Sequence, residues 1–342
     1  MLLTLTVSLL LQGPEVAVDR LQELVRNWFD TIPGVSASEA DEVHVDAARD
    51  LVAALDQFPL EDLDIWSAAL VNGRNYPNLP SEGVQAAIGS QTHLPLAWFA
   101  PASFLDAEFP QPLVVALSTS APEKSCVALR QLFPSSAMLV APNLQGLADF
   151  EDINPWRLRL LDALGFAFRN FKVDRNLVLL VAMEPELEQL VSRYQAVLPH
   201  FFARWGTGGE KSIAEAVPRN PYPLAFTAAF IESGAGRNFW VQALSFTPTG
   251  GASNKAHLNV KVNRKFNTIH LDGRGVYRVD LYLNNEIVDL DRPITVVRNG
   301  LSSRFLARPS ARTLIENFVL NADAQALFPA MIRGLDIPAV GK

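Results

Sequence analysis

The chain has 342 residues, of which 49% are hydrophobic, and its formal net charge is −7. This length allows two domains, or one domain with an appendage, and the apolar content allows a sizeable buried core. Because the net charge is negative and no block of five or more like charges occurs, a nucleic-acid-binding surface is not expected. The single cysteine, Cys126, excludes an internal disulfide and leaves the compartment open.

The chain begins with an apolar run, Leu2 to Leu11, that is closed by Gln-Gly-Pro. The run has the length of a signal-peptide core, but no Lys or Arg precedes it and no clean cleavage site follows it. Residues 1–13 are therefore a possible signal segment, which would make the protein periplasmic or extracellular. The alternative is a first strand, or a start codon chosen too early, in a cytoplasmic protein. No stretch is long and apolar enough to predict an integral membrane span.

Residues 14–80 are predicted to form an N-terminal helical region. Apolar residues recur at helical spacing in two stretches, Leu21, Leu24, Val25, Trp28, Phe29 and Ile32, and then Ala47, Ala48, Leu51, Val52 and Leu55. Ser36 or Ser38 can cap the second helix, and residues 62–70 indicate a third. Gly, Asn and Pro in "NGRNYPNLPSEG" end the pattern near residue 80.

Residues 81–220 alternate apolar runs of strand length with helical patterns. The runs are "LPLAWFAP", "PLVVALS", "AMLVAPNL" and "LVLLVA", and helices are predicted between them over 122–133 and 155–171. Near-continuous apolar strands that alternate with helices are typical of a parallel sheet covered on both faces.

Residues 221–342 indicate an all-β, sandwich-like domain. Its predicted strands are "NFWVQALSF", "HLNVKVN", "TIHLDG", "YRVDLYLN", "EIVDL", "ITVVRNG" and "SSRFLAR". Asn284-Asn285 and Asn299-Gly300 favour two-residue turns between them. A closing helix is predicted over 312–331.

The run "LVLLVA" leads through a sharp polar corner, Ala182-Met183-Glu184-Pro185-Glu186, into a helical pattern. Strand, sharp turn and helix form the context of the G-x-S-x-G nucleophile elbow. However, Ala182 and Glu186 stand where the glycines should be, and Glu184 stands where serine should be. Proline suits the first helical position and acids favour a helix N-terminus, so we interpret the corner as a helix start. A catalytic carboxylate at Glu184 is the alternative.

At this corner the sequence resembles a known family. The segments "PLAWFAPASFLDAEFPQPLVVALST", "AMLVAPNL" and "FRNFKVDRNLVLLVAMEPE" resemble the core of the α/β-hydrolase esterases and peptidases, within the bacterial group related to polyhydroxybutyrate depolymerases and dienelactone hydrolases. A β-rich C-terminal extension is frequent in that group, and "RNPYPLAFTAAFIESGAGRNFWVQAL" and "NTIHLDGRGVYRVDLYLNNEIVDLDRPITVVRNG" resemble it. The resemblance covers residues 90–335 and rests on local pattern.

The resemblance places the family's functional residues where their chemistry is missing. The nucleophile falls on Glu184, and the loop that helps build the oxyanion hole falls on Ser118 and Thr119, in a stretch without glycine. The 20 residues from Phe201 to Asn220 are too few for the strands that would carry the acid and the histidine. The resemblance thus implies a shortened, mostly parallel α/β-hydrolase-like sheet.

Such a shortening places the strand over residues 177–182 near an edge of a sheet of about four to six strands. An exposed apolar edge strand favours aggregation, so a cover is expected. Residues 197–205 as a last strand, or the helices of residues 15–72 or 312–331, are the candidates. If none covers the edge, a homodimer is the simplest outcome.

Three further features have competing interpretations. Cys126 is a second candidate nucleophile because dienelactone hydrolases use cysteine, but its helical stretch lacks flanking glycines, so a buried structural thiol is favoured. "GTGGEKS", residues 206–212, lacks the Gly directly before Lys that a phosphate loop needs, which favours a flexible connector. No metal or other cofactor is expected, since metal-ligand spacing is absent among the histidines, His44, His93, His200, His257 and His270.

Together these features predict a catalytically inactive hydrolase homologue with a binding or structural role, whose partner is an unknown protein or small molecule. The alternative is a divergent esterase or peptidase that uses Glu184 or Cys126. A third hypothesis is the loss of a catalytic region from an otherwise dispensable protein. The degenerate active-site positions are Ser118, Thr119, Ala182, Met183, Glu184 and Glu186.

Overall fold

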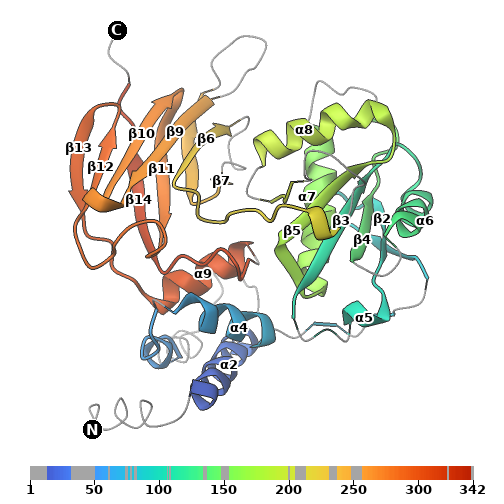
Figure 1. Cartoon of the computed structure of the whole chain (residues 1–342), viewed down its shortest axis with the longest axis horizontal. Helices are drawn as coiled ribbons and strands as arrows, with labels where there is room; N and C mark the ends of the chain where they lie inside the picture. The colour runs from blue at the N-terminus through green and yellow to red at the C-terminus, as the bar shows by residue number, and fades with distance from the viewer. Residues whose placement is uncertain are drawn as a thin grey trace. The chain divides into compact units, whose positions relative to one another are not determined.

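The structure, a computed structural model, describes residues 14–31, 51–60, 62–73, 76–77, 79–80, 83–105, 107, 109–133, 137–147, 154–198, 201–204, 213–230, 237–247, 256–321 and 323–339. The apolar segment 1–13, the serines Ser36 and Ser38, and residues 206–212 lie outside the described residues. The chain divides into two compact units (Figure 1). One unit is Tyr76–Pro221, and the other joins Met1–Asn75 with Tyr222–Lys342.

The unit Tyr76–Pro221 contains a five-stranded sheet with the strand order β1-β2-β4-β3-β5. The strands are β1 (Gln85–Ile88), β2 (Pro95–Phe99), β3 (Gln111–Leu117), β4 (Met138–Pro142) and β5 (Val173–Ala182). The helices are α5 (Ala102–Leu105), α6 (Pro122–Leu132), α7 (Asn154–Asn170) and α8 (Glu188–Val197), with single 3-10 turns η1 (Pro185–Leu187) and η2 (Ile213–Glu215).

Helices α6 and α7 cover opposite faces of this sheet. Cys126 and Leu129 of α6 share a buried core with Ala97 and Phe99 of β2. Trp98, between them in the strand, lies against Phe166 of α7, with ring centroids 6.1 Å apart. Because successive side chains of a strand point to opposite faces, the two helices lie on opposite sides. This explains the near-continuous apolar sequence of β3 and β4, which are buried on both faces.

The hairpin of β1 and β2 is fixed to α7 by one carboxylate. Asp162, which is 3% exposed, accepts hydrogen bonds from the hydroxyl and the amide of Thr92 at 2.6 and 2.9 Å. It also accepts from the Ser90 hydroxyl and the Gln91 amide, both at 3.2 Å. Burial by itself raises the pKa of Asp162. The hydrogen bonds together lower the pKa by more than burial raises it, so the pKa lies below its usual value. A Cβ at Gly89 would overlap this carboxylate.

Strand β5 lies at an edge of the sheet, as the sequence predicted. The amide of Ala203 donates to the carbonyl of Val178 at 2.9 Å, and the amide of Arg219 donates to that of Asn176 at 3.0 Å. Coil after α8 therefore covers part of the edge. Of the candidate covers, residues 197–205 thus contact this edge, but not as a full strand: α8 continues to Val197, and among the described residues of the segment only Arg204 forms a bridge, with Val217.

The predicted fold class is wrong. Two of the four strand pairings of this sheet, β1 with β2 and β2 with β4, are antiparallel, so the sheet is mixed and not mostly parallel. The described chain is mostly β, with three sheets and few helices, and it does not form a hydrolase-like parallel sheet with a separate N-terminal helical region. The apolar run of β2 was informative about burial, but a two-sided apolar strand has the same sequence signature in either direction.

The N-terminal helices belong to the same unit as the C-terminal residues. Helices α2 (Pro14–Thr31) and α4 (Leu63–Gly73) share a buried core with α9 (Ala311–Asn321). Asp56 accepts a hydrogen bond from the Ala311 amide at 2.8 Å, at the first residue of α9. Gly73 lets α4 approach α2, since a Cβ there would fall 2.9 Å from Val25 Cγ1. In the described part of the chain, no helix is long and apolar enough to cross a membrane.

The remaining strands form two sheets that share one buried core, so this part is a two-layer β-sandwich. One sheet is mixed and has the order β13-β12-β10-β9-β6, and the other is antiparallel and has the order β14-β11-β8-β7. The strands are β6 (Ala225–Phe230), β7 (Arg237–Asn238), β8 (Val241–Phe246), β9 (Ala256–Asn263), β10 (Thr268–Arg274), β11 (Val276–Leu283), β12 (Ile294–Arg298), β13 (Leu301–Phe305) and β14 (Ala330–Asp336). The 3-10 turn η3 (Arg264–Phe266) joins β9 to β10.

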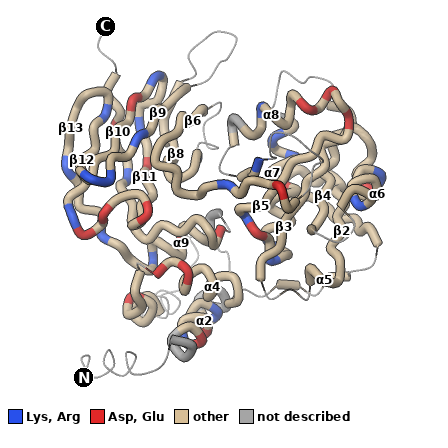
Figure 2. The backbone as a smooth tube through the Cα atoms, in the orientation of Figure 1, with Lys and Arg blue, Asp and Glu red and all other residues tan. Residues whose placement is uncertain are grey.

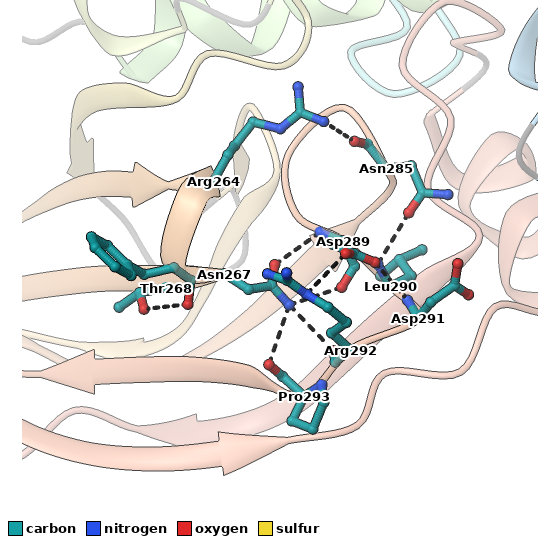
Figure 3. Close-up of polar contacts among 10 residues, drawn as sticks. Arg264, Asn267, Thr268, Asn285, Asp289, Leu290, Asp291, Arg292 and Pro293 are labelled. Carbon is teal, nitrogen blue, oxygen red and sulfur yellow. Dashed lines mark hydrogen bonds and ion pairs between the residues drawn. The ribbon is translucent and has the colours of Figure 1, made fainter.

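The expected strand "EIVDL" is wrong, because this segment is a loop held by asparagine side chains. Asn284 accepts from the Glu286 and Ile287 amides, Asn285 accepts from the Leu290 amide, and the buried Asn267 binds Asp289. Asn267 follows η3 in the left-handed region, with φ 49°, and is 1% exposed. Its amide group donates to the backbone carbonyls of Asp289, Arg292 and Pro293, and its carbonyl accepts from the Asp289 amide at 2.8 Å (Figure 3). These bonds replace the ladder that a strand would need.

The predicted closing helix over residues 312–331 is confirmed only in its first part. Helix α9 ends at Asn321, and β14 begins at Ala330 as an edge strand of the antiparallel sheet. Pro329 lies between them and cannot take part in a helical interior. The helical spacing seen beyond Asn321 in the sequence therefore had no structural counterpart.

Candidate functional site

The candidate site lies where the neighbouring parallel strands β3 and β5 end. The crossover through α6 carries the chain from β3 to β4 on one side, and the crossover through α7 returns it to β5 on the other side of β3. The order of the strands therefore reverses between β3 and β5. In α/β sheets, ligands bind outside the carboxyl ends of the strands at such a reversal.

Ser118, Thr119 and Glu184 meet at these strand ends. Leu117 and Ala182 are the last paired residues of β3 and β5. Just beyond them, the Ser118 hydroxyl donates to Glu184 Oε1 at 2.7 Å, and the Thr119 amide donates to Glu184 Oε2 at 3.4 Å. The structure thus brings together three of the predicted site positions, which are 65 and 66 residues apart in the chain.

Glu184 starts a helix with its backbone but not with its side chain. It is extended, with φ −117° and ψ 141°, and Pro185 begins η1 directly after it. Its carboxylate makes no capping hydrogen bond to the turn and instead accepts from Ser118 and Thr119. The interpretation as a helix start therefore accounts for the backbone alone, and the side chain joins two strand ends.

The other predicted positions do not contribute polar groups to this contact. The Met183 amide donates to the Leu117 carbonyl at 2.9 Å, which extends the pairing of β3 with β5 by one bond. The Met183 side chain packs against the core under α6. Ala182 is half-buried and carries no functional group, and Glu186 is exposed on η1.

The geometry does not suit nucleophilic attack by Ser118. This side chain is only 3% exposed, and its oxygen accepts a hydrogen bond from the Ser120 amide at 3.1 Å. The Ser118 hydroxyl donates its proton to Glu184. In the described part of the chain, no histidine is hydrogen-bonded to Ser118 or Glu184. A serine hydrolase needs an accessible hydroxyl beside a base and an unoccupied oxyanion donor. Sequence reasoning missed Ser120, although its spacing from Ser118 is that of a serine turn.

Cys126 lies inside α6 and is completely buried. Burial raises the pKa of its thiol to about 12, despite a lowering by the nearby Arg130. The thiolate, which is the reactive form, is therefore scarce at neutral pH. This environment supports a structural thiol and gives no support to a cysteine nucleophile.

We expect the folded protein to resist thiol modification. At neutral pH, a disulfide reagent such as dithionitrobenzoate should label Cys126 at least about a hundredfold more slowly than in denaturant, because the thiol is shielded and protonated. Absorbance of the released thiolate measures both rates. Labelling in the folded state at the denatured rate would contradict the buried position.

Among the described residues, no group of three or more His, Cys, Asp and Glu side chains could hold a metal ion. His93 lies in the β1–β2 turn, and His257 and His270 lie on β9 and β10, whereas His44 and His200 fall outside the described residues. Neither a protein-family model, nor a curated protein, nor a solved structure matches this chain.

Proposed function

We propose that this protein is non-catalytic and has a binding or structural role. The observation that carries the proposal is the hydrogen bond from the buried Ser118 hydroxyl to the Glu184 carboxylate. With the Thr119 amide on the second oxygen, these groups satisfy one another at the strand ends. Under the resemblance to esterases and peptidases, the same positions would present a nucleophile and an oxyanion donor to a substrate.

An internal carboxylate at this position opposes acyl-transfer chemistry. The tetrahedral intermediate of acyl transfer carries a negative oxygen, which oxyanion donors must stabilise. Here the Thr119 amide already faces the negative charge of Glu184, and that charge would repel a second anion. The Ser118–Glu184 bond is better suited to holding β3 and β5 together at their ends.

The alternative enzyme hypotheses lack support from the same residues. For Glu184 as a nucleophile, the contacts that the structure gives its carboxylate are internal ones, to the Ser118 hydroxyl and the Thr119 amide at two strand ends. Cys126 would need exposure and a lowered pKa, and its pKa is raised. The identity of the partner, and a homodimer, stay predictions.

A fluorophosphonate probe with an ester panel tests the proposal. We expect no stoichiometric labelling of the full chain, and no ester hydrolysis that is lost on Ser118→Ala or Glu184→Gln, because the Ser118 hydroxyl is buried and donates its proton to Glu184. Ser192→Ala, which removes an exposed hydroxyl from α8, is the matched control. Labelling that disappears in Ser118→Ala and persists in Ser192→Ala would overturn the non-catalytic assignment.

A further inference from the structure

One corner of the β-sandwich exposes two large apolar side chains. Phe266, in the turn between β9 and β10, is 66% exposed, and Leu306, directly after β13, is 68% exposed. Strand register places both at the same end of the mixed sheet, because Thr268 pairs with Thr295 and Thr295 pairs with Arg304. Single exposed apolar residues are common, but two at one end of a sheet are worth explaining by a contact.

The turn that carries Phe266 is held firmly. Asn263 caps η3 by accepting from the Phe266 amide, and Asn267 closes the turn in the left-handed conformation. The buried side chain of Asn267 binds the loop that follows β11 (Figure 3). Arg264 of the turn also donates to the Asn285 carbonyl at 2.8 Å. Phe266 therefore projects from an ordered turn.

Basic side chains surround this corner. Arg264 and Lys265 lie in the turn, and Lys261 and Arg304 are exposed on the adjoining outward face of the sheet. Residues 222–342 contain 14 Lys and Arg against 9 Asp and Glu, a net charge of +5 in a chain whose total is −7. Figure 2 shows Lys and Arg on the strands of this part.

The acids near the corner only partly offset these charges. They lie in the loop between β11 and β12, where Glu286 and Asp291 are exposed. The third acid of the loop, Asp289, is paired with Arg292 at 2.9 Å. No Asp or Glu lies in the turn, or at the ends of β9, β10, β12 and β13 that adjoin it. The surface beside Phe266 is therefore positive.

We propose that this corner, made of Arg264–Phe266, Arg304 and Leu306, docks on an anionic lipid surface. Apolar side chains that project beside Lys and Arg suit the membrane interface, where they enter the headgroup region while the cations meet lipid phosphates. The inference concerns a different site from Ser118 and Glu184 and is independent of the proposed function.

A lipid surface fits this corner better than other polyanions or an acidic protein. Single-stranded nucleic acids need several aromatic side chains on which successive bases stack, and besides Phe266 in the turn, the described outward face of the sheet carries no Phe, Tyr or Trp. An amphipathic peptide helix needs an apolar groove. Here the apolar side chains project from two separate chain segments, the β9–β10 turn and the end of β13, and do not line a groove. Isolated projecting side chains of this kind can insert into a membrane interface.

Vesicle sedimentation of the full chain tests the proposal. At low ionic strength, vesicles with phosphatidylglycerol in phosphatidylcholine should bind the protein, and phosphatidylcholine alone should not. Phe266→Ala should weaken the partition coefficient about tenfold, since a buried aromatic ring contributes strongly. Arg304→Glu should weaken it at least about fivefold.

Two variants at the opposite end of the same sheet are matched controls. Leu301→Ala removes an apolar residue that is 58% exposed at the other end of β13, and Arg274→Glu reverses an exposed charge at the far end of β10. Both should change binding by less than about twofold, because a strand of this length separates the ends by about 20 Å. Absence of binding to the anionic vesicles, or equal losses in Arg304→Glu and Arg274→Glu, would overturn the proposal.

Discussion

Replacing Asn267 by aspartate is expected to lower the free energy of unfolding of the sandwich by about 4 kcal/mol. The change keeps the size of the side chain and its tolerance of the left-handed conformation, so the backbone can stay as it is. However, it puts a carboxylate, 1% exposed, against the carbonyl oxygens of Asp289, Arg292 and Pro293. Those carbonyls lose their donor and face a buried negative charge.

Guanidinium unfolding measures this loss. Hydrogen exchange of peptides from β9 to β12 monitors the unfolding, so that the loss is assigned to the unit that contains the sandwich. Asn263→Asp is the matched control because it makes the same chemical change at an exposed residue. There the side chain only accepts from the Phe266 amide, at 3.4 Å, and aspartate caps a turn equally well. We expect a change below about 0.5 kcal/mol for the control. Equal effects of the two substitutions would contradict the role assigned to Asn267.

Asp162→Asn is expected to lower the free energy of unfolding by about 2 kcal/mol near neutral pH. The carboxylate accepts from Thr92, Gln91 and Ser90, and an amide of the same shape would turn its NH2 group toward these donors. The pKa of Asp162 is lower in the folded state than its usual value, so the folded state favours the charged form. The stabilisation is therefore complete above the unfolded-state pKa of about 3.9 and is lost as the pH falls through the lower folded-state pKa.

Urea unfolding near pH 7 and at about pH 3 measures this pH dependence. The difference in the free energy of unfolding between wild type and Asp162→Asn should be smaller at the lower pH. Asp174→Asn is the control, since Asp174 is half-buried in β5 and accepts from the Asn176 amide at 2.9 Å. It should cost less than about 1 kcal/mol at either pH. A difference for Asp162→Asn that grows on acidification would show that the protonated form is the one the fold binds.

Sequence pattern predicted helices and strands correctly where a segment's own apolar residues decide its secondary structure and burial. The apolar runs "PLVVALS", "AMLVAPNL" and "LVLLVA" predicted β3, β4 and β5, helical spacing predicted α2 and α7, and helices were also expected where α4 and α6 lie. These predictions need only local burial and residue chemistry. The proposed correspondence of Glu184 and Ser118 to a hydrolase nucleophile and oxyanion loop rests on resemblance alone and stays a prediction.

Pattern failed where the outcome depended on a distant partner. The run of β2 pairs antiparallel to β4, and nothing in a two-sided apolar strand encodes its direction. The segment "EIVDL" has strand composition, yet Asn267, about 20 residues earlier, binds the carbonyl and the amide of Asp289 and helps to hold the segment as a loop. At the start of helix α9, the Ala311 amide donates a hydrogen bond to the Asp56 carboxylate, 255 residues away, and this contact joins the first and last parts of the chain in one unit.

The sequence alone shows that Glu184 occupies the polar corner after "LVLLVA" and that "STSAPEKS", which begins with Ser118, contains no glycine. Only the tertiary structure decided what these residues do. Ser118 and Glu184 are 66 residues apart, and they meet because the crossovers through α6 and α7 place β3 beside β5. Periodicity records which face of an element is buried, whereas a hydrogen bond between two strand ends depends on which strands become neighbours.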